Sequence, residues 1–102
     1  MKTERKDEET ELLHVVIRLC DGMGLWWWHD YSFKINRRGL PDLLVLGKQG
    51  AMWRELKSQD GRHSLDQLRV QRLIVRAGWD YDTWRPGDLI SGRIAAELAA
   101  IM

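Results

Sequence analysis

The chain has 102 residues, 44% of them hydrophobic and 30% charged, a composition typical of one compact domain and too short for a second independent core. No apolar run approaches the ~18 to 20 residues that cross a bilayer, and the first residues are charged rather than signal-like. The net charge is only +1, and the single Cys20 excludes both an internal disulfide and a closed thiolate zinc site. We therefore expect one cytoplasmic domain spanning residues 1–102.

The charge is distributed unevenly along the chain. Residues 34–76 hold ten basic and four acidic side chains, a local net charge of +6, whereas the segments 2–11 and 79–102 each carry a net charge of −2. Partners respond to local fields more than to the total charge, so the middle of the chain is expected to bind a polyanion.

Hydrophobic periodicity predicts the elements of the first half. Apolar residues at helical spacing indicate a first helix over about residues 8–20, which ends at a glycine-rich turn. Cys20, at the end of this helix, is expected to be a small buried hydrophobe. Residues 25–28, a leucine followed by three tryptophans, favour a short strand, and a polar loop over 29–39 follows. The apolar run 43–46, the turn-like 47–50 and the segment 51–56 together predict a β hairpin.

The second half is predicted to hold two helices and one strand. Ser64 with Gln67 three residues later is a capping-box pattern, typical of a helix start, and that helix is expected to end near Gly78. Residues 79–84 alternate like a strand, and Pro86 and Gly87 interrupt the pattern. Residues 89–101 indicate a final amphipathic helix, whose apolar face is traced by Leu89, Ile90, Ile94, Leu98 and Ile101. The order α-β-β-β-α-β-α predicts an α/β fold with a mixed sheet of about four strands and helices on its faces.

Three ionisable residues of the hairpin point to chemistry. If the turn is centred between residues 48 and 49, Asp42 lies directly opposite Glu55, while Glu55 and Lys57 share a face and Leu56 points into the packing. Two neighbouring carboxylates repel unless a cation lies between them, and both could bind one hard ion such as Mg²⁺. The competing interpretation is a solvent-facing ion pair of Glu55 with a neighbouring base, which contributes ~0 to 1 kcal/mol.

The stretch Gly39-Leu40-Pro41-Asp42, followed by Glu55-Leu56-Lys57, resembles the PD-(D/E)xK nuclease signature. More narrowly, residues 9–88 resemble virus-type replication-repair nuclease (VRR-NUC) domains, which are often phage-encoded and related to Holliday-junction resolvases. The resemblance implies a single restriction-endonuclease-like domain that uses Mg²⁺, with Mn²⁺ able to substitute. It implies that Asp42, Glu55 and the backbone carbonyl of Leu56 bind the metal and that Lys57 is the catalytic lysine.

The resemblance also assigns roles to two helices. Gln67 matches the glutamine after the third motif; it shares a helical face with Val70 and Ile74 that should point toward the sheet, but it could equally cap the helix through Ser64. The family places an acid on the first helix. Glu9 fits best, Glu8 and Glu11 are close rivals, and a solvated first turn that complements the helix dipole explains the same acidic run.

Candidate DNA contacts follow from charge and aromatic content. Arg37 and Arg38 precede the proposed active strand, and Arg62 and Ser64 flank the second helix start. Further candidates for phosphate contacts are Arg54, Arg69, Arg72 and Arg76. The three tryptophans 26–28 could stack on unpaired bases. Alternatively, because alternation sends Trp27 to the face opposite Trp26 and Trp28, one side would pack in the core and an exposed remainder would form a self-association surface.

These patterns predict a metal-dependent endonuclease that cuts branched DNA, in phage or bacterial replication, recombination or repair. DNA is the expected partner, with a second copy of the chain in a homodimer and with neither a membrane nor an organic cofactor. For a phage-encoded protein the location would be the host cytoplasm. Two alternatives stay open: a non-cleaving DNA-binding module of the same fold, and a protein-interaction domain that uses the tryptophan strand.

Overall fold

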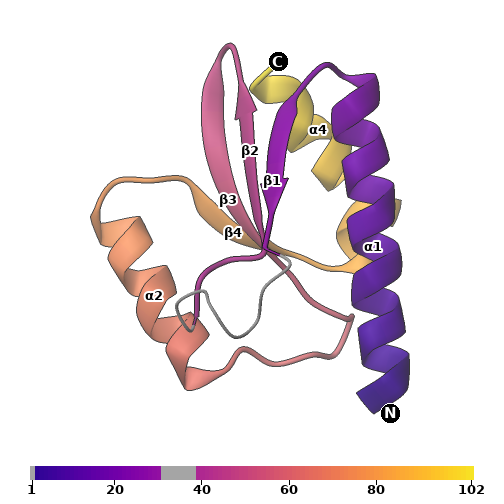
Figure 1. Cartoon of the computed structure of the whole chain (residues 1–102), viewed down its shortest axis with the longest axis vertical. Coiled ribbons are helices and arrows are strands. Elements are labelled where there is room, and N and C mark those ends of the chain that lie inside the picture. Colours follow the sequence, from indigo (N-terminus) through magenta and orange to yellow (C-terminus); the bar gives the residue numbers. More distant parts are fainter. Residues whose placement is uncertain (1, 31–38) are drawn as a thin grey trace.

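The chain folds into a four-stranded sheet with helices on both sides (Figure 1). The computed structural model describes residues 2–30 and 39–102, and their side chains from Asp7 onward. Its elements are α1 (Lys2–Gly22), β1 (Trp26–His29), β2 (Leu43–Gly47), β3 (Gly50–Leu56), α2 (Leu65–Arg76), β4 (Tyr81–Trp84), α3 (Pro86–Ile90) and α4 (Arg93–Ala100). Within the described ranges, no helix has the length and apolar content to cross a bilayer.

The predicted α/β class and mixed sheet are confirmed. The strands follow the order β1-β2-β3-β4, in which the first three are antiparallel and β4 runs parallel to β3. A parallel neighbour needs a crossover connection, and α2 supplies it.

The single helix expected over residues 89–101 is wrong. The segment forms two helices, because Gly92 adopts a left-handed conformation (φ +84°) that an α-helix interior cannot hold, and Pro86 opens the first of them instead of preceding it. The break also turns Ile90 outward, where 87% of it is exposed, although the periodicity placed it on the packing face. The first helix is longer than the predicted 8–20.

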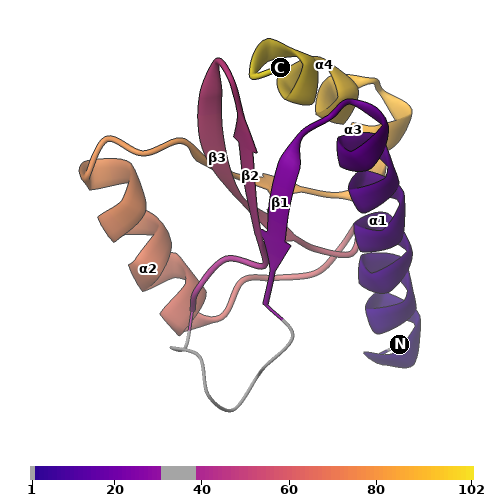
Figure 2. The same ribbon diagram turned by 45° about the horizontal axis from the view of Figure 1, so that its top comes forward.

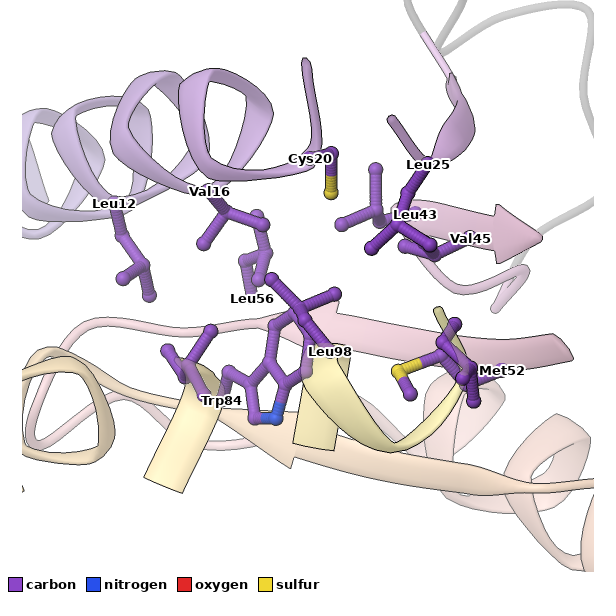
Figure 3. Packing of buried hydrophobic residues seen from close by; sticks show 12 residues of the cluster. Leu12, Val16, Cys20, Leu25, Leu43, Val45, Met52, Leu56, Trp84 and Leu98 are labelled. Atoms are coloured by element: carbon purple, nitrogen blue, oxygen red, sulfur yellow. The ribbon is translucent and has the colours of Figure 1, made fainter. Parts of the chain in front are cut away.

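One face of the sheet forms the core. Leu43, Val45 and Met52 project from β2 and β3 toward α1 and α4, and Figure 3 shows Val16 and Leu98 of those helices packed against them. Cys20 lies among these side chains as the small buried hydrophobe that the sequence predicted, and burial raises the pKa of its thiol to about 11.

The core face also contains Arg54, which was expected to contact DNA phosphates. That expectation is wrong, because the side chain is 3% exposed and its guanidinium pairs with Asp80 at 2.8 Å and Glu97 at 2.9 Å. The guanidinium also lies 5.2 Å from the centre of the Trp84 ring. A buried arginine needs such partners, so Arg54 ties β3 to β4 and α4.

The helix on the other face is α2, which packs beside β4 on the side away from α1, α3 and α4 (Figure 2). The predicted capping box is present: the Ser64 hydroxyl accepts the Gln67 backbone N–H at 3.1 Å, and the Gln67 side chain accepts the Ser64 N–H at 2.9 Å. No residue of α2, all of which is described, is buried. The helix therefore rests on the sheet without closing over it.

Gly47 lies where the hairpin meets the C-terminus, and a Cβ there would lie 1.9 Å from the Ile101 carbonyl oxygen and 2.8 Å from Leu25 Cδ2. Because backbone must move to accommodate it, we expect Gly47→Ala to lower the free energy of unfolding by about 1–3 kcal/mol in urea denaturation. Gly22→Ala is the control, since nothing lies within 4 Å of that position and alanine has a higher helix propensity than glycine. Equal stability of the two variants would contradict this packing.

Candidate active site

The hairpin register brings two carboxyl groups together. Leu43 lies opposite Arg54, so Asp42 and Glu55 are the next facing positions outward, as the sequence predicted. The Asp42 backbone N–H donates to Glu55 Oε1 at 3.2 Å, and the Leu56 N–H donates to Asp42 Oδ2 at 2.9 Å. These reciprocal bonds hold the two side chains in fixed positions at the end of β2 and β3.

Both carboxyl groups are perturbed by their surroundings. Glu55 is only 2% exposed, and burial followed by repulsion from the Asp42 carboxylate raises its pKa to about 8. Burial likewise raises the pKa of Asp42, and the hydrogen bond from the Leu56 N–H opposes that rise. Glu55 therefore does not form the solvent-facing ion pair of the competing interpretation. The two carboxyl groups of Asp42 and Glu55 instead favour a shared proton or a bound cation.

Lys57 and Gln67 both reach Glu55. The Lys57 ammonium lies 3.8 Å from Glu55 Oε2, and the Gln67 side-chain amide donates to the same oxygen. The other end of that amide accepts the Ser64 N–H, so Gln67 caps α2 and binds Glu55 at once. The two roles that the sequence left as alternatives are compatible.

Gly39 explains how α2 comes close enough for this contact. Its φ is +86°, and a Cβ there would lie 2.3 Å from the Asp66 carbonyl oxygen and 2.9 Å from Val70 Cγ2. A glycine therefore lets the first turn of α2 press against the backbone just before Pro41. This places the glycine of the motif in a packing role.

The three acids of the first helix occupy different surroundings. Burial raises the pKa of Glu9, the Lys57 ammonium opposes that rise and the Asp42 carboxylate adds to it, so Glu9 lies within the field of the site. Glu8 instead accepts the Gln59 backbone N–H at 3.2 Å. Glu11 is exposed and, with Glu8, lines a shallow groove between α1 and α3. Glu9 is therefore coupled electrostatically to both Asp42 and Lys57.

Sequence reasoning did not find His63 and Arg85. His63 Nε2 lies 2.7 Å from Thr83 Oγ1, and Thr83 is the β4 neighbour of Glu55; burial, then the charges of Lys57 and Arg85, lower the pKa of the imidazole. Arg85 donates to the carbonyls of Ser58 and Gly61, at 2.7 Å each, and so fixes the loop after Lys57. These contacts join residues 20 to 27 positions apart, and local patterns give no signal for them.

The structure distributes the candidate DNA contacts unevenly. Arg37 and Arg38 lie outside the described residues. Arg62, Arg69, Arg72 and Arg76 are all exposed, and Arg69 also forms an ion pair with Asp66. The further candidate Ser64 is exposed, and its hydroxyl already accepts a backbone N–H in the helix cap.

The oxygen donors suit a hard cation. Asp42 and Glu55 offer two carboxylates, and the Leu56 backbone lies beside them through its bond to Asp42. The described residues contain no cluster of three His, Cys, Asp or Glu side chains arranged to bind a metal. A cation at the pair would thus take two side-chain ligands and complete its shell from backbone, water or substrate.

Comparisons with known proteins return no match: no family model, no curated protein and no solved structure corresponds to this chain. The geometry of the residues therefore carries the functional argument.

The raised pKa of Glu55 makes stability depend on pH. Because the folded protein retains a proton that the unfolded chain releases near pH 4.5, the metal-free protein should lose stability as pH rises from about 4.5 through about 8. We expect Glu55→Gln to remove at least ~2 kcal/mol of this loss, measured by urea denaturation in EDTA at pH 5 and 8.5. The exposed Asp60→Asn is the control, and an unchanged pH dependence in Glu55→Gln would refute the perturbation.

Proposed function

We propose that this protein is a metal-dependent DNA endonuclease of the PD-(D/E)xK type that acts on branched DNA. The single observation that carries the proposal is the placing of Asp42 opposite Glu55, with the Lys57 ammonium 3.8 Å from the Glu55 carboxylate. The preference for branched substrates rests on the resemblance of residues 9–88 to VRR-NUC domains.

A structural ion pair accounts less well for this arrangement. Opposed carboxyls at a strand end lower stability, and the pKa of Glu55 is raised to about 8 despite the nearby lysine. Such unfavourable placements concentrate at functional sites, where a ligand or metal compensates them. Asp42 directly precedes β2, Glu55 lies in β3 and Lys57 directly follows β3, while Gln67 of α2 holds the Glu55 carboxylate from a further element.

Asp42, Glu55 and the Leu56 carbonyl would hold Mg²⁺, or Mn²⁺ in its place. When bound, the ion would polarise a phosphoryl oxygen and lower the pKa of a coordinated water. The other roles fall to side chains of the protein. Lys57 orients the attacking water and stabilises the negative charge that develops on the phosphate, while Gln67 fixes the Glu55 carboxylate.

The site lies at one end of the sheet, and residues 34–76, which contain it, carry a net charge of +6. Arg62 is exposed in the loop that leads to α2. Phosphate contacts from this loop and from Arg37 and Arg38 would supply sequence-independent affinity. In this arrangement Glu9 of α1 is the helix-borne acid, because it shares the electrostatic environment of Lys57 and Asp42.

Cleavage assays test the proposal directly. Plasmid, linear duplex, flap and four-way-junction DNA would be incubated with the protein with and without Mg²⁺. We expect junction cleavage that EDTA abolishes. We also expect Asp42→Asn and Lys57→Ala each to slow cleavage at least ~100-fold, because the first weakens a ligand of the metal and the second removes the ammonium that stabilises charge at the reacting phosphate.

Two exposed residues provide matched controls. Asp60→Asn and Lys48→Ala make the same chemical changes away from the site and should cleave at the wild-type rate. DNA affinity of the inactive variants, measured by fluorescence anisotropy, should stay within a few-fold of wild type. Undiminished cleavage in EDTA would overturn the mechanism, and salt-sensitive binding without any cleavage would favour the accessory module.

Metal binding has a readout that needs no DNA. Because the two carboxyls repel at pH 8, saturating Mg²⁺ should raise the melting temperature of the wild type by several degrees, as expected for a ligand at ~100 times its Kd. The Glu55→Gln variant should show no comparable shift, and Asp60→Asn should respond as the wild type does. An equal rise in all three proteins would indicate nonspecific binding.

A further inference from the structure

The connection from β3 to α2 brings a histidine beside the candidate site. His63 directly precedes the cap of α2, and its Nε2 lies 2.7 Å from Thr83 Oγ1. Thr83 is the β4 partner of Glu55, and paired residues of neighbouring strands point to the same face of a sheet. The imidazole therefore contacts the strand next to Glu55, ~4.8 Å across the sheet and on the side away from Asp42.

Other contacts already hold this connection in place. Figure 1 shows the segment crossing the end of the sheet from the α1 side to the start of α2. Near its beginning, Arg85 donates to the carbonyls of Ser58 and Gly61 at 2.7 Å each, and the capping box of α2 fixes its end. Because the segment is fixed at both ends without the imidazole, the bond between His63 and Thr83 serves to orient the ring.

The charges around the imidazole favour an anion as its ligand. The second ring nitrogen, Nδ1, has no hydrogen-bond partner among the described residues. Lys57, after β3, and Arg85, after β4, are the charged groups that act on the ring, and both add to burial in lowering the pKa of His63. The ring is therefore neutral at pH 8, and the two cations beside it repel cations and attract anions.

The Thr83 hydroxyl allows the neutral ring to present a donor. A hydroxyl can donate as well as accept, so Thr83 can donate to Nε2 and leave the ring proton on Nδ1. In this tautomer Nδ1–H donates without placing a third positive charge beside Lys57 and Arg85. Phosphate oxygens of a nucleic acid accept such bonds, and they are the anions that the proposed substrate carries.

We propose that His63 binds a backbone phosphate of DNA through its Nδ1–H, beside the phosphate that is cleaved. This inference rests on the proposed nuclease function and adds a contact that sets the position of the DNA strand on the site. The acid pair lies between β2 and β3, whereas His63 contacts β4, so the two would bind different phosphates of one strand. Contacts of this kind fix register and orientation and carry no sequence information.

Two substitutions separate the bond to Thr83 from the bond to phosphate. In His63→Gln the amide falls near the former Nε2 and keeps the bond to Thr83, but no donor remains at the Nδ1 position. In His63→Asn the amide falls near the former Nδ1, so the donor is kept and the bond to Thr83 is lost. We expect His63→Gln to bind four-way-junction DNA about tenfold more weakly at an unchanged melting temperature. We expect His63→Asn to bind within about threefold of the wild type but to melt at a lower temperature.

Fluorescence anisotropy in EDTA at pH 8 measures these affinities without cleavage, and circular dichroism measures the melting temperatures. His14→Gln is the matched control, because His14 is exposed on α1, and this variant should bind and melt as the wild type does. Wild-type affinity in His63→Gln would overturn the proposal. A loss of affinity that follows a lower melting temperature in both His63 variants would also overturn it, since it would reduce His63 to a structural role.

Uncharged linkages in the DNA locate the phosphate. Single phosphates near the branch of the junction would be replaced by methylphosphonates, one position at a time. One replacement should weaken binding of the wild type about tenfold and leave binding of His63→Gln unchanged, because that variant has already lost the partner. If every replacement affects both proteins equally, His63 does not contact a phosphate.

The result is separable from that of the proposed nuclease activity. A wild type that binds DNA through His63 but cleaves none in Mg²⁺ would support the phosphate contact and refute the activity. Cleavage by the wild type, with undiminished DNA affinity in His63→Gln, would refute the contact and support the activity. A wild type that binds no DNA would overturn both.

Discussion

The register of the β2–β3 hairpin is the constraint on which the candidate site depends. With Leu43 opposite Arg54, Asp42 must face Glu55, whereas a shift by one residue would send one of the two to the core face. The register is fixed by the core itself, because Val45 and Met52 must both point toward α1 and α4. Hydrophobic burial at one face thus forces two like charges together at the other.

The two faces of the sheet differ in how their buried charges are balanced. On the core face, the buried Arg54 is compensated by Asp80, Glu97 and the Trp84 ring, so its charge is used within the fold. On the opposite face, the acid pair lacks such compensation, and Lys57 only moderates the repulsion at 3.8 Å. Rows of tryptophan and leucine continue that face beyond the acids.

Long-range packing also explains the support around the acid pair. Gly39 lets α2 approach, Gln67 then reaches Glu55, and Arg85 holds the loop that follows Lys57. These contacts converge from α2 and from the end of β4, segments that local periodicity treats as unrelated. The break in the C-terminal helix also depends on packing, since Gly92 in a left-handed conformation separates α3 from α4 and lets the two helices pack in different directions.

The sequence by itself determined the mixed α/β class, the hairpin register, the capping box at Ser64 and the burial of Cys20, because alternation, turn residues and caps are local signals. It could not choose among Glu8, Glu9 and Glu11, since all three share one helix turn and only the position of α1 against the sheet separates them. It misplaced Arg54 and Ile90 for the same reason. Burial of a charge, or exposure of an apolar side chain, is decided by which elements meet in three dimensions.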